Sequence, residues 1–311
     1  MMVLKLKKFN ELAFYYNTLL TDAASLANQR KLLLYCVLVC LIASLYLTKV
    51  SLYGTSAIAL ILQIITMFMD QKIKAKRSLA VEIQKHSMLM DFFGAKAANQ
   101  PEIERLKIKA GLSIYNQAKV KRELFEKEKN EKPIKEEGKS SNLKENQKYD
   151  DKPNKKLLSK IHENSYWNNN LYNFSYQASI NLVAIVIFLI FIVLVTVIPN
   201  IKLDTDYTII RLIFTVMSFG IIYEFIEATL KYQNSSKVMK DLDQKISSVS
   251  EINEQEILSI FSTYLLIIST TPHIPKAIYI KYQDLLNAGW ASRLKVINES
   301  STLSVNDYEG V

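Results

Sequence analysis

The sequence predicts an all-α, polytopic membrane protein with four transmembrane helices in two hairpins plus helical cytoplasmic regions. The strongest observation is the stretch 178–198, which holds 21 residues without one charged side chain. A helix of that length rises about 31 Å, close to the ~30 Å hydrocarbon core of a bilayer. Helices of soluble proteins average about 11–12 residues, so a buried soluble helix is the weaker interpretation.

The second observation is the segregation of charge along the chain. Residues 71–175 carry 23 Lys/Arg and 14 Asp/Glu, and uncharged apolar runs lie on both sides of them. This basic excess suits an anionic partner such as inner-leaflet lipid, a nucleotide or a nucleic acid. A solvated charged linker explains much of it equally well.

The N-terminal region, residues 1–30, reads as a cytoplasmic amphipathic helix with apolar residues at helical spacing. It either lies on the membrane or packs on other cytoplasmic helices. Residues 31–70 form the first predicted transmembrane hairpin, with spans at 32–48 and 52–69 joined by a tight turn.

Polar residues recur along one face of the second span, at the spacing of a helix. They are Ser56, Gln63, Thr66 and Asp70, with Ala59 between the first two. Contact with lipid would be costly for such a face. It therefore either makes hydrogen bonds between helices or lines a water-filled pore, and we list these residues as pore-lining candidates.

A basic inner-face cluster follows this span directly: Lys72, Lys74, Lys76 and Arg77. By the positive-inside rule it places both chain termini in the cytoplasm. Residues 71–125 form a cytoplasmic helical segment with a break near Pro101, and residues 126–156 form a charged, low-complexity insert. The aromatic residues of 157–177 suit the interface just before a span.

The second predicted hairpin covers residues 178–230 and carries a second polar seam. Its members are Arg211, Thr215 and Ser218, which we also list as pore-lining candidates. Arg211 lies one turn inside the span and can snorkel to the outer surface. Residues 231–311 form a cytoplasmic helical tail, in which the apolar run 257–268 is too short to span and is expected to pack in a core.

Motifs of enzyme chemistry are not found in the sequence. It has no Gly-rich phosphate loop, no His/Glu pair at zinc spacing and no nucleophile elbow. We therefore expect no enzymatic activity, no catalytic residue, no metal ligand and no cofactor.

Four local segments follow one another in the chain: Asn28-Gln29-Arg30, then Ala80-Val81-Glu82-Ile83-Gln84 with Asp91-Phe92-Phe93, then Asn164-Ser165-Tyr166-Trp167 with Leu171 and Tyr172, and last Gln283-Asp284-Leu285-Leu286. In this order they resemble the SMODS-associated four-transmembrane family, predicted pore-forming effectors of bacterial anti-phage nucleotide-signalling systems.

The resemblance implies a multi-pass protein of the bacterial inner membrane that opens a pore when a cyclic nucleotide or oligonucleotide signal arrives during anti-phage defence. Its expected partners are membrane lipid, that signal and further copies of the chain, and no nucleic acid polymer. The alternative function is a membrane-anchored scaffold whose cytoplasmic helices recruit a partner without pore activity.

Overall fold

The computed structural model describes residues 11–47, 49–131, 153–197, 208–248 and 253–306, and within these ranges it is all-helical. Two long helices come first, α1 (Glu11–Tyr46) and α2 (Lys49–Phe93). The short helices η1 (Ala95–Ala97), α3 (Gln100–Ala110) and α4 (Leu112–Glu131) follow. The second half of the chain holds α5 (Pro153–Val197), α6 (Thr208–Ser248), α7 (Glu254–Thr270) and α8 (Lys276–Asn306).

Within the described ranges, three helices are long and apolar enough to cross a membrane, which supports a membrane protein. The segments found are Glu11–Ser44, Ser51–Phe93 and Pro153–Ile192. Large apolar side chains of α5 are exposed there, including Phe188 at 62% and Phe191 at 61%. Such a surface is expected to face lipid rather than water.

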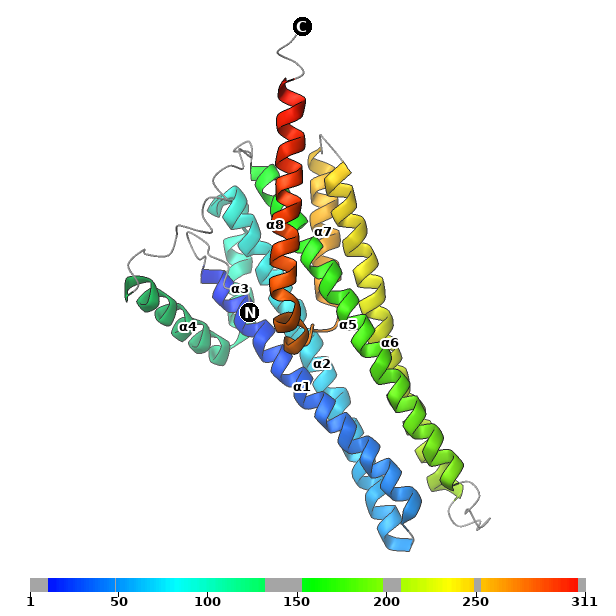
Figure 1. Cartoon of the computed structure of the whole chain (residues 1–311). Helices are drawn as coiled ribbons and strands as arrows, with labels where there is room; N and C mark the ends of the chain where they lie inside the picture. Colours follow the sequence, from blue (N-terminus) through cyan, green and yellow to red (C-terminus); the bar gives the residue numbers. More distant parts are fainter. Residues whose placement is uncertain (1–10, 48, 132–152, 198–207, 249–252, 307–311) are drawn as a thin grey trace.

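The long helices α1, α2, α5 and α6 run past the ends of their apolar stretches without a break (Figure 1). The sequence boundaries at 30/31, 70/71, 177/178 and 230/231 therefore fall inside continuous helices. We call residues 31–47, 49–70 and 178–197, which lie in the three apolar helices α1, α2 and α5, and residues 208–223, the predicted fourth span, the membrane segments. The rest of the described chain is called the head.

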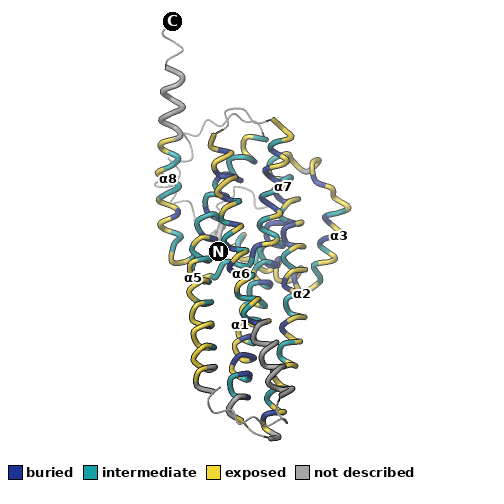
Figure 2. Tube along the Cα trace, turned by 90° about the vertical axis from the view of Figure 1, so that its right-hand side faces the viewer, coloured by how far each residue is buried: buried dark blue, intermediate teal, exposed yellow. Residues whose placement is uncertain are grey.

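The helices pair as neighbours, α1 with α2 and α5 with α6 (Figure 1). In the membrane segments the two pairs meet through α1, α2 and α6, where Val37, Ala59 and Ile221 have no exposed surface. Figure 2 shows that burial is concentrated in the head, while much of the opposite end of the molecule is exposed.

Helix α7 packs one face against the head, in contact with α2, α5 and α6, while Leu258 and Leu266 on its other face are exposed. Ile260, Phe261 and Tyr264 are its most deeply buried side chains. The short apolar run of the tail therefore packs in a core, as its length predicts. A capping box closes its first turn, since Asn253 accepts from the Glu256 backbone and Glu256 accepts from the Asn253 backbone.

The first residues of α1 also pack in the head. Leu12, Tyr15 and Leu19 are almost fully buried against α2, α3 and α4. Of the two alternatives for the N-terminal helix, packing on other helices is the one observed for residues 11–30, whereas residues 1–10 lie outside the described part of the chain. The predicted break near Pro101 is present too, because Asn99 caps α3 by accepting from the Glu102 backbone.

Candidate functional site

Three charged side chains meet where the membrane segments join the head. Arg30 of α1 donates to the Glu224 carboxylate of α6 at 2.5 Å, and its Nη1 lies 3.5 Å from the Asp70 carboxylate of α2. Lys74 adds a second ion pair to Asp70, at 2.6 Å. We call Arg30, Asp70 and Glu224 the Arg30 junction.

The antiparallel course of α1 and α2 sets this geometry. Arg30 lies beside the last turns of the α2 membrane segment, and its Nε donates to the Thr66 carbonyl at 3.2 Å. The side chains of all three junction residues are only 20–26% exposed to solvent. Charge pairs with this much desolvation interact more strongly than surface pairs, and salt screens them less.

The polar seam of α2 faces the interior of the bundle. Thr66 has no exposed surface, Ser56 and Gln63 are half-buried, and Asp70 belongs to the Arg30 junction. The Thr66 hydroxyl donates to the Gln63 backbone carbonyl at 2.8 Å. The side-chain oxygen of Gln63 is buried and accepts no hydrogen bond from a described residue.

The second seam is only partly described. Arg211, Thr215 and Ser218 lie in the helix α6, but their side chains fall outside the described part of the chain. Ile221, three residues after Ser218, packs on α1 and α2.

The four basic residues after the α2 membrane segment do not form one cluster. Lys72 and Lys74 are exposed, Lys76 pairs with Asp22 of α1, and Arg77 turns into the head. Successive residues on a helix point about 100° apart, so neighbours in sequence diverge in space. The structure thus divides Lys72, Lys74, Lys76 and Arg77 among different surroundings, and their place at the inner face of the membrane stays a prediction.

Arg77 connects α2 to the end of α7. Its Nη2 donates to the Ile268 carbonyl in the last turn of α7 at 2.9 Å. Helix ends leave their last carbonyls without intrahelical partners and carry partial negative charge, so a guanidinium suits this place. The contact ties the helix of the second membrane segment to α7 of the head.

The linker between α7 and α8 is fixed to α6 by two short hydrogen bonds. The hydroxyls of Thr271 and Ser235 lie 2.6 Å apart, and the Tyr232 hydroxyl donates to the His273 carbonyl at 2.6 Å. Burial, with the charges of Arg77 and Lys31, lowers the pKa of His273 to about 4. His273 is therefore neutral at pH 7.

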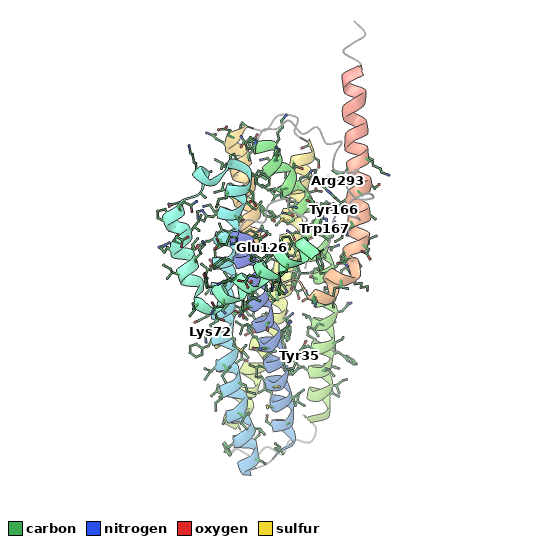
Figure 3. All side chains as sticks on the ribbon, turned by 90° about the vertical axis from the view of Figure 1, so that its left-hand side faces the viewer. Tyr35, Lys72, Glu126, Tyr166, Trp167 and Arg293 are labelled. Carbon is green, nitrogen blue, oxygen red and sulfur yellow. The ribbon has the colours of Figure 1, made fainter. Side chains whose placement is uncertain are left out.

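A further polar cluster holds α8 against α5 and α6. Arg293 of α8 donates to both oxygens of Asp243 on α6, at 3.0 and 2.8 Å, and its guanidinium lies over the rings of Tyr166 and Trp290. Figure 3 shows Arg293 close to Tyr166 and Trp167. Burial alone would raise the pKa of Asp243, but hydrogen bonds from His162 and Arg293 outweigh it and lower that pKa.

His162 and Ser247 belong to the same cluster, yet they do not form a catalytic relay. The Nε2 atom of His162 lies 3.1 Å from Asp243 and 3.0 Å from the Ser247 hydroxyl. A relay needs one ring nitrogen for the carboxylate and the other for the hydroxyl. Among the described residues no three His, Cys, Asp or Glu side chains gather as metal ligands.

A cavity of about 420 Å³ lies between α2 and α3. It is lined by Glu82, Lys85, His86, Asn99, Glu102 and Leu106. The Nδ1 atom of His86 is buried there without a hydrogen-bond partner among the described residues. The two carboxylates oppose binding of a phosphate, so the lining does not favour an anionic ligand.

Sequence reasoning missed the Arg30 junction and the Asp243 cluster. Arg30 and Glu224 are 194 residues apart, and Asp243 and Arg293 are 50 apart. No local spacing relates such pairs. Comparisons of the chain with family models, curated proteins and solved structures found no match.

Proposed function

We propose that the protein is a four-span effector of the bacterial inner membrane that forms or opens a pore in response to a nucleotide second messenger during anti-phage defence. The fourth span is the membrane segment of α6, and both termini lie in the cytoplasm. The resemblance to the SMODS-associated four-transmembrane family supplies the signal and the setting.

The observation that carries the proposal is the Arg30 junction beside the polar seam of α2. Arg30 binds Asp70 of one helix pair and Glu224 of the other, at the head-facing end of the seam with Gln63 and Thr66. Neither a charged triad nor a buried amide oxygen without a partner among the described residues is needed for anchoring, and both are costly near lipid. They suit a conduit that is closed in this structure and opens when the pairs separate.

Helix α7 is the route by which the head acts on this junction. It contacts α2 through Arg77 and α6 through its linker, so it touches both helix pairs. A signal that shifts α7 changes the distance between the pairs. Four helices rarely enclose an aqueous lumen, so the open pore is built by several copies of the chain.

The test is dye release from liposomes of phosphatidylethanolamine and phosphatidylglycerol that contain the reconstituted full chain. Cyclic di- and trinucleotides are added, and release is expected. Gln63→Leu and Thr215→Leu should each abolish it, because they remove polar groups from the two seams. Asn181→Leu is the matched control, since Asn181 is an exposed polar residue of the α5 membrane segment outside both seams. Release that is absent, or that survives both seam changes, contradicts the pore.

A second function, the membrane-anchored scaffold, is favoured by the burial of the α2 seam. Thr66 has no exposed surface, and Ala59 packs on α1 and α6. A scaffold needs no conduit, so liposomes would keep their dye under every nucleotide. The head would still bind its partner in the Gln63→Leu and Thr215→Leu variants.

A further inference from the structure

Two large apolar side chains of the head are exposed at one corner. Ile108 ends α3 with 80% of its surface exposed, and Leu112 begins α4 with 74%. These are the highest exposed fractions of any large apolar side chain in the described part of the chain, above those of the lipid-facing Phe188 and Phe191. Adjacent exposed apolar residues of this size indicate an interaction surface.

The corner is fixed by its backbone. Gly111 separates the two helices with a φ of 86°, and its N–H donates to the Ile108 carbonyl. A positive φ of this kind favours glycine, because a Cβ would clash with the backbone. Behind the corner, Leu106 and Ile114 are buried in the head. The structure thus presents Ile108 and Leu112 from a firmly packed base.

The corner lies at the end of the α3–α4 pair that is nearer to the membrane segments (Figure 1). In Figure 1 the lower end of α3 and the start of α4 form the part of that helix pair closest to the membrane segments. In Figure 3 they lie near the level of Lys72, which follows the α2 membrane segment by two residues. The headgroup layer of the bilayer that holds α2 is therefore the surface nearest to the corner.

The charge around the corner matches that surface. Six basic residues lie between positions 105 and 122, but three of them are paired with carboxylates: Arg105 with Glu102, Lys107 with Glu104 and Arg122 with Glu126. The unbalanced positive charge near the corner is therefore that of Lys109, Lys119 and Lys121. Lys109, between Ile108 and the glycine turn, is exposed. Basic residues around an apolar tip are typical of segments that insert at the surface of anionic lipid.

We propose that the α3–α4 corner is a second, peripheral membrane contact, in which Ile108 and Leu112 insert among the anionic headgroups of the leaflet next to the head. The contact fixes one side of the head to the bilayer. It does not depend on whether the membrane segments conduct, so its test is independent of the pore.

The experiment measures lipid contact at single labelled sites in the reconstituted full chain. Cys36 and Cys40 are replaced by Ala, and a fluorophore is attached to Leu112→Cys. The control is Val296→Cys on α8, which is 63% exposed and lies three residues beyond Arg293, far from Lys72 in Figure 3. Liposomes of phosphatidylcholine and phosphatidylglycerol contain a lipid whose nitroxide quencher lies at the boundary of headgroup and acyl chain.

Quenching at position 112 should exceed that at position 296 by about two-fold or more, because an inserted residue reaches roughly 5–10 Å into this layer. Adding Ile108→Asn should reduce the quenching at 112 toward the control value. Equal quenching at the two sites overturns the proposal. So does cross-linking of 112 to 112 between copies without lipid quenching, because the corner would then bind a second copy of the chain.

Discussion

Arg30 shows how one residue can join parts of a membrane protein that are distant in sequence. Its guanidinium contacts a carbonyl and two carboxylates on two other helices. The sequence predicts Arg30 only as a charge flanking a span and as part of a family segment. Pairing across 194 residues depends on how the helices pack, which no spacing rule contains.

Replacing Arg30 by Gln should lower the free energy of unfolding by about 1–3 kcal/mol, because two partly buried carboxylates lose their partner. Thermal unfolding in detergent measures this. Lys74→Gln is the control, since Lys74 binds the same Asp70 from an exposed position and should cost less than about 1 kcal/mol.

The same variant tests the closing role of the junction. In cells with a potential-sensitive dye, Arg30→Gln should depolarise the membrane without any signal, and Lys74→Gln should not. A folded Arg30→Gln protein that leaves the potential intact would show that the junction only holds the fold together.

His273 should make stability depend on pH. Its pKa is about 4 in the folded protein and 6.5 without the fold, so the unfolded chain binds the proton first as pH falls. The contribution of neutral His273 to the free energy of unfolding is fully present above pH 6.5. It falls by about 3 kcal/mol as the pH drops from 6.5 to 4.

The measurement compares unfolding of the wild type and His273→Gln across this pH range. The two proteins differ in the slope of the free energy of unfolding against pH. That difference reports His273 alone, because the carboxylates titrate in both proteins. If the free energies of unfolding of the two proteins change with pH in parallel, water reaches the imidazole of His273 in the folded state.

Helix α8 is held by its close approach to α5. A Cβ at Gly289 would collide with the hydroxyl oxygen of Tyr166, whereas the ring carbon Cζ would lie at an ordinary 3.5 Å. Gly289→Ala should therefore destabilise the docking of α8 by about 1–3 kcal/mol.

A double-mutant cycle tests this cause. In the Tyr166→Phe background the oxygen is gone, so Gly289→Ala should be neutral or stabilising through its better helix propensity. Hydrogen exchange of α8 backbone amides reports the docking. If Gly289→Ala destabilised α8 equally in the wild type and in Tyr166→Phe, the collision with the Tyr166 hydroxyl would not be the cause.

Helices as elements are predicted well by the sequence, and their ends less so. The apolar period of α1 and α7, and the Asn–Pro signal before α3, are local properties, and the helices appear where these signals lie. The different partners of Lys74, Lys76 and Arg77 have a physical cause, because helix rotation points them to Asp70, Asp22 and α7, respectively. Only the packed neighbours decide which of these charges is buried.

At the scale of the whole molecule, the pass number and orientation are open to a direct test. Reporters that are active only outside the cytoplasm are fused after Asn200 and after Val311. The four-span proposal predicts activity for the first fusion and none for the second, since the loop lies outside and the C-terminus inside. Activity at both sites would remove the fourth span and leave the three that length and composition support.

The unbroken course of α2 makes it a lever. Its 45 residues correspond to about 67 Å of continuous helix, and Asp70 lies near the middle. Without a proline or glycine in its central turns, the helix has no soft point at which a push on the head could dissipate. If α2 pivots as a rigid rod about its contact with Arg30, a displacement of a few ångströms at its head end moves its other end by a similar distance in the opposite direction.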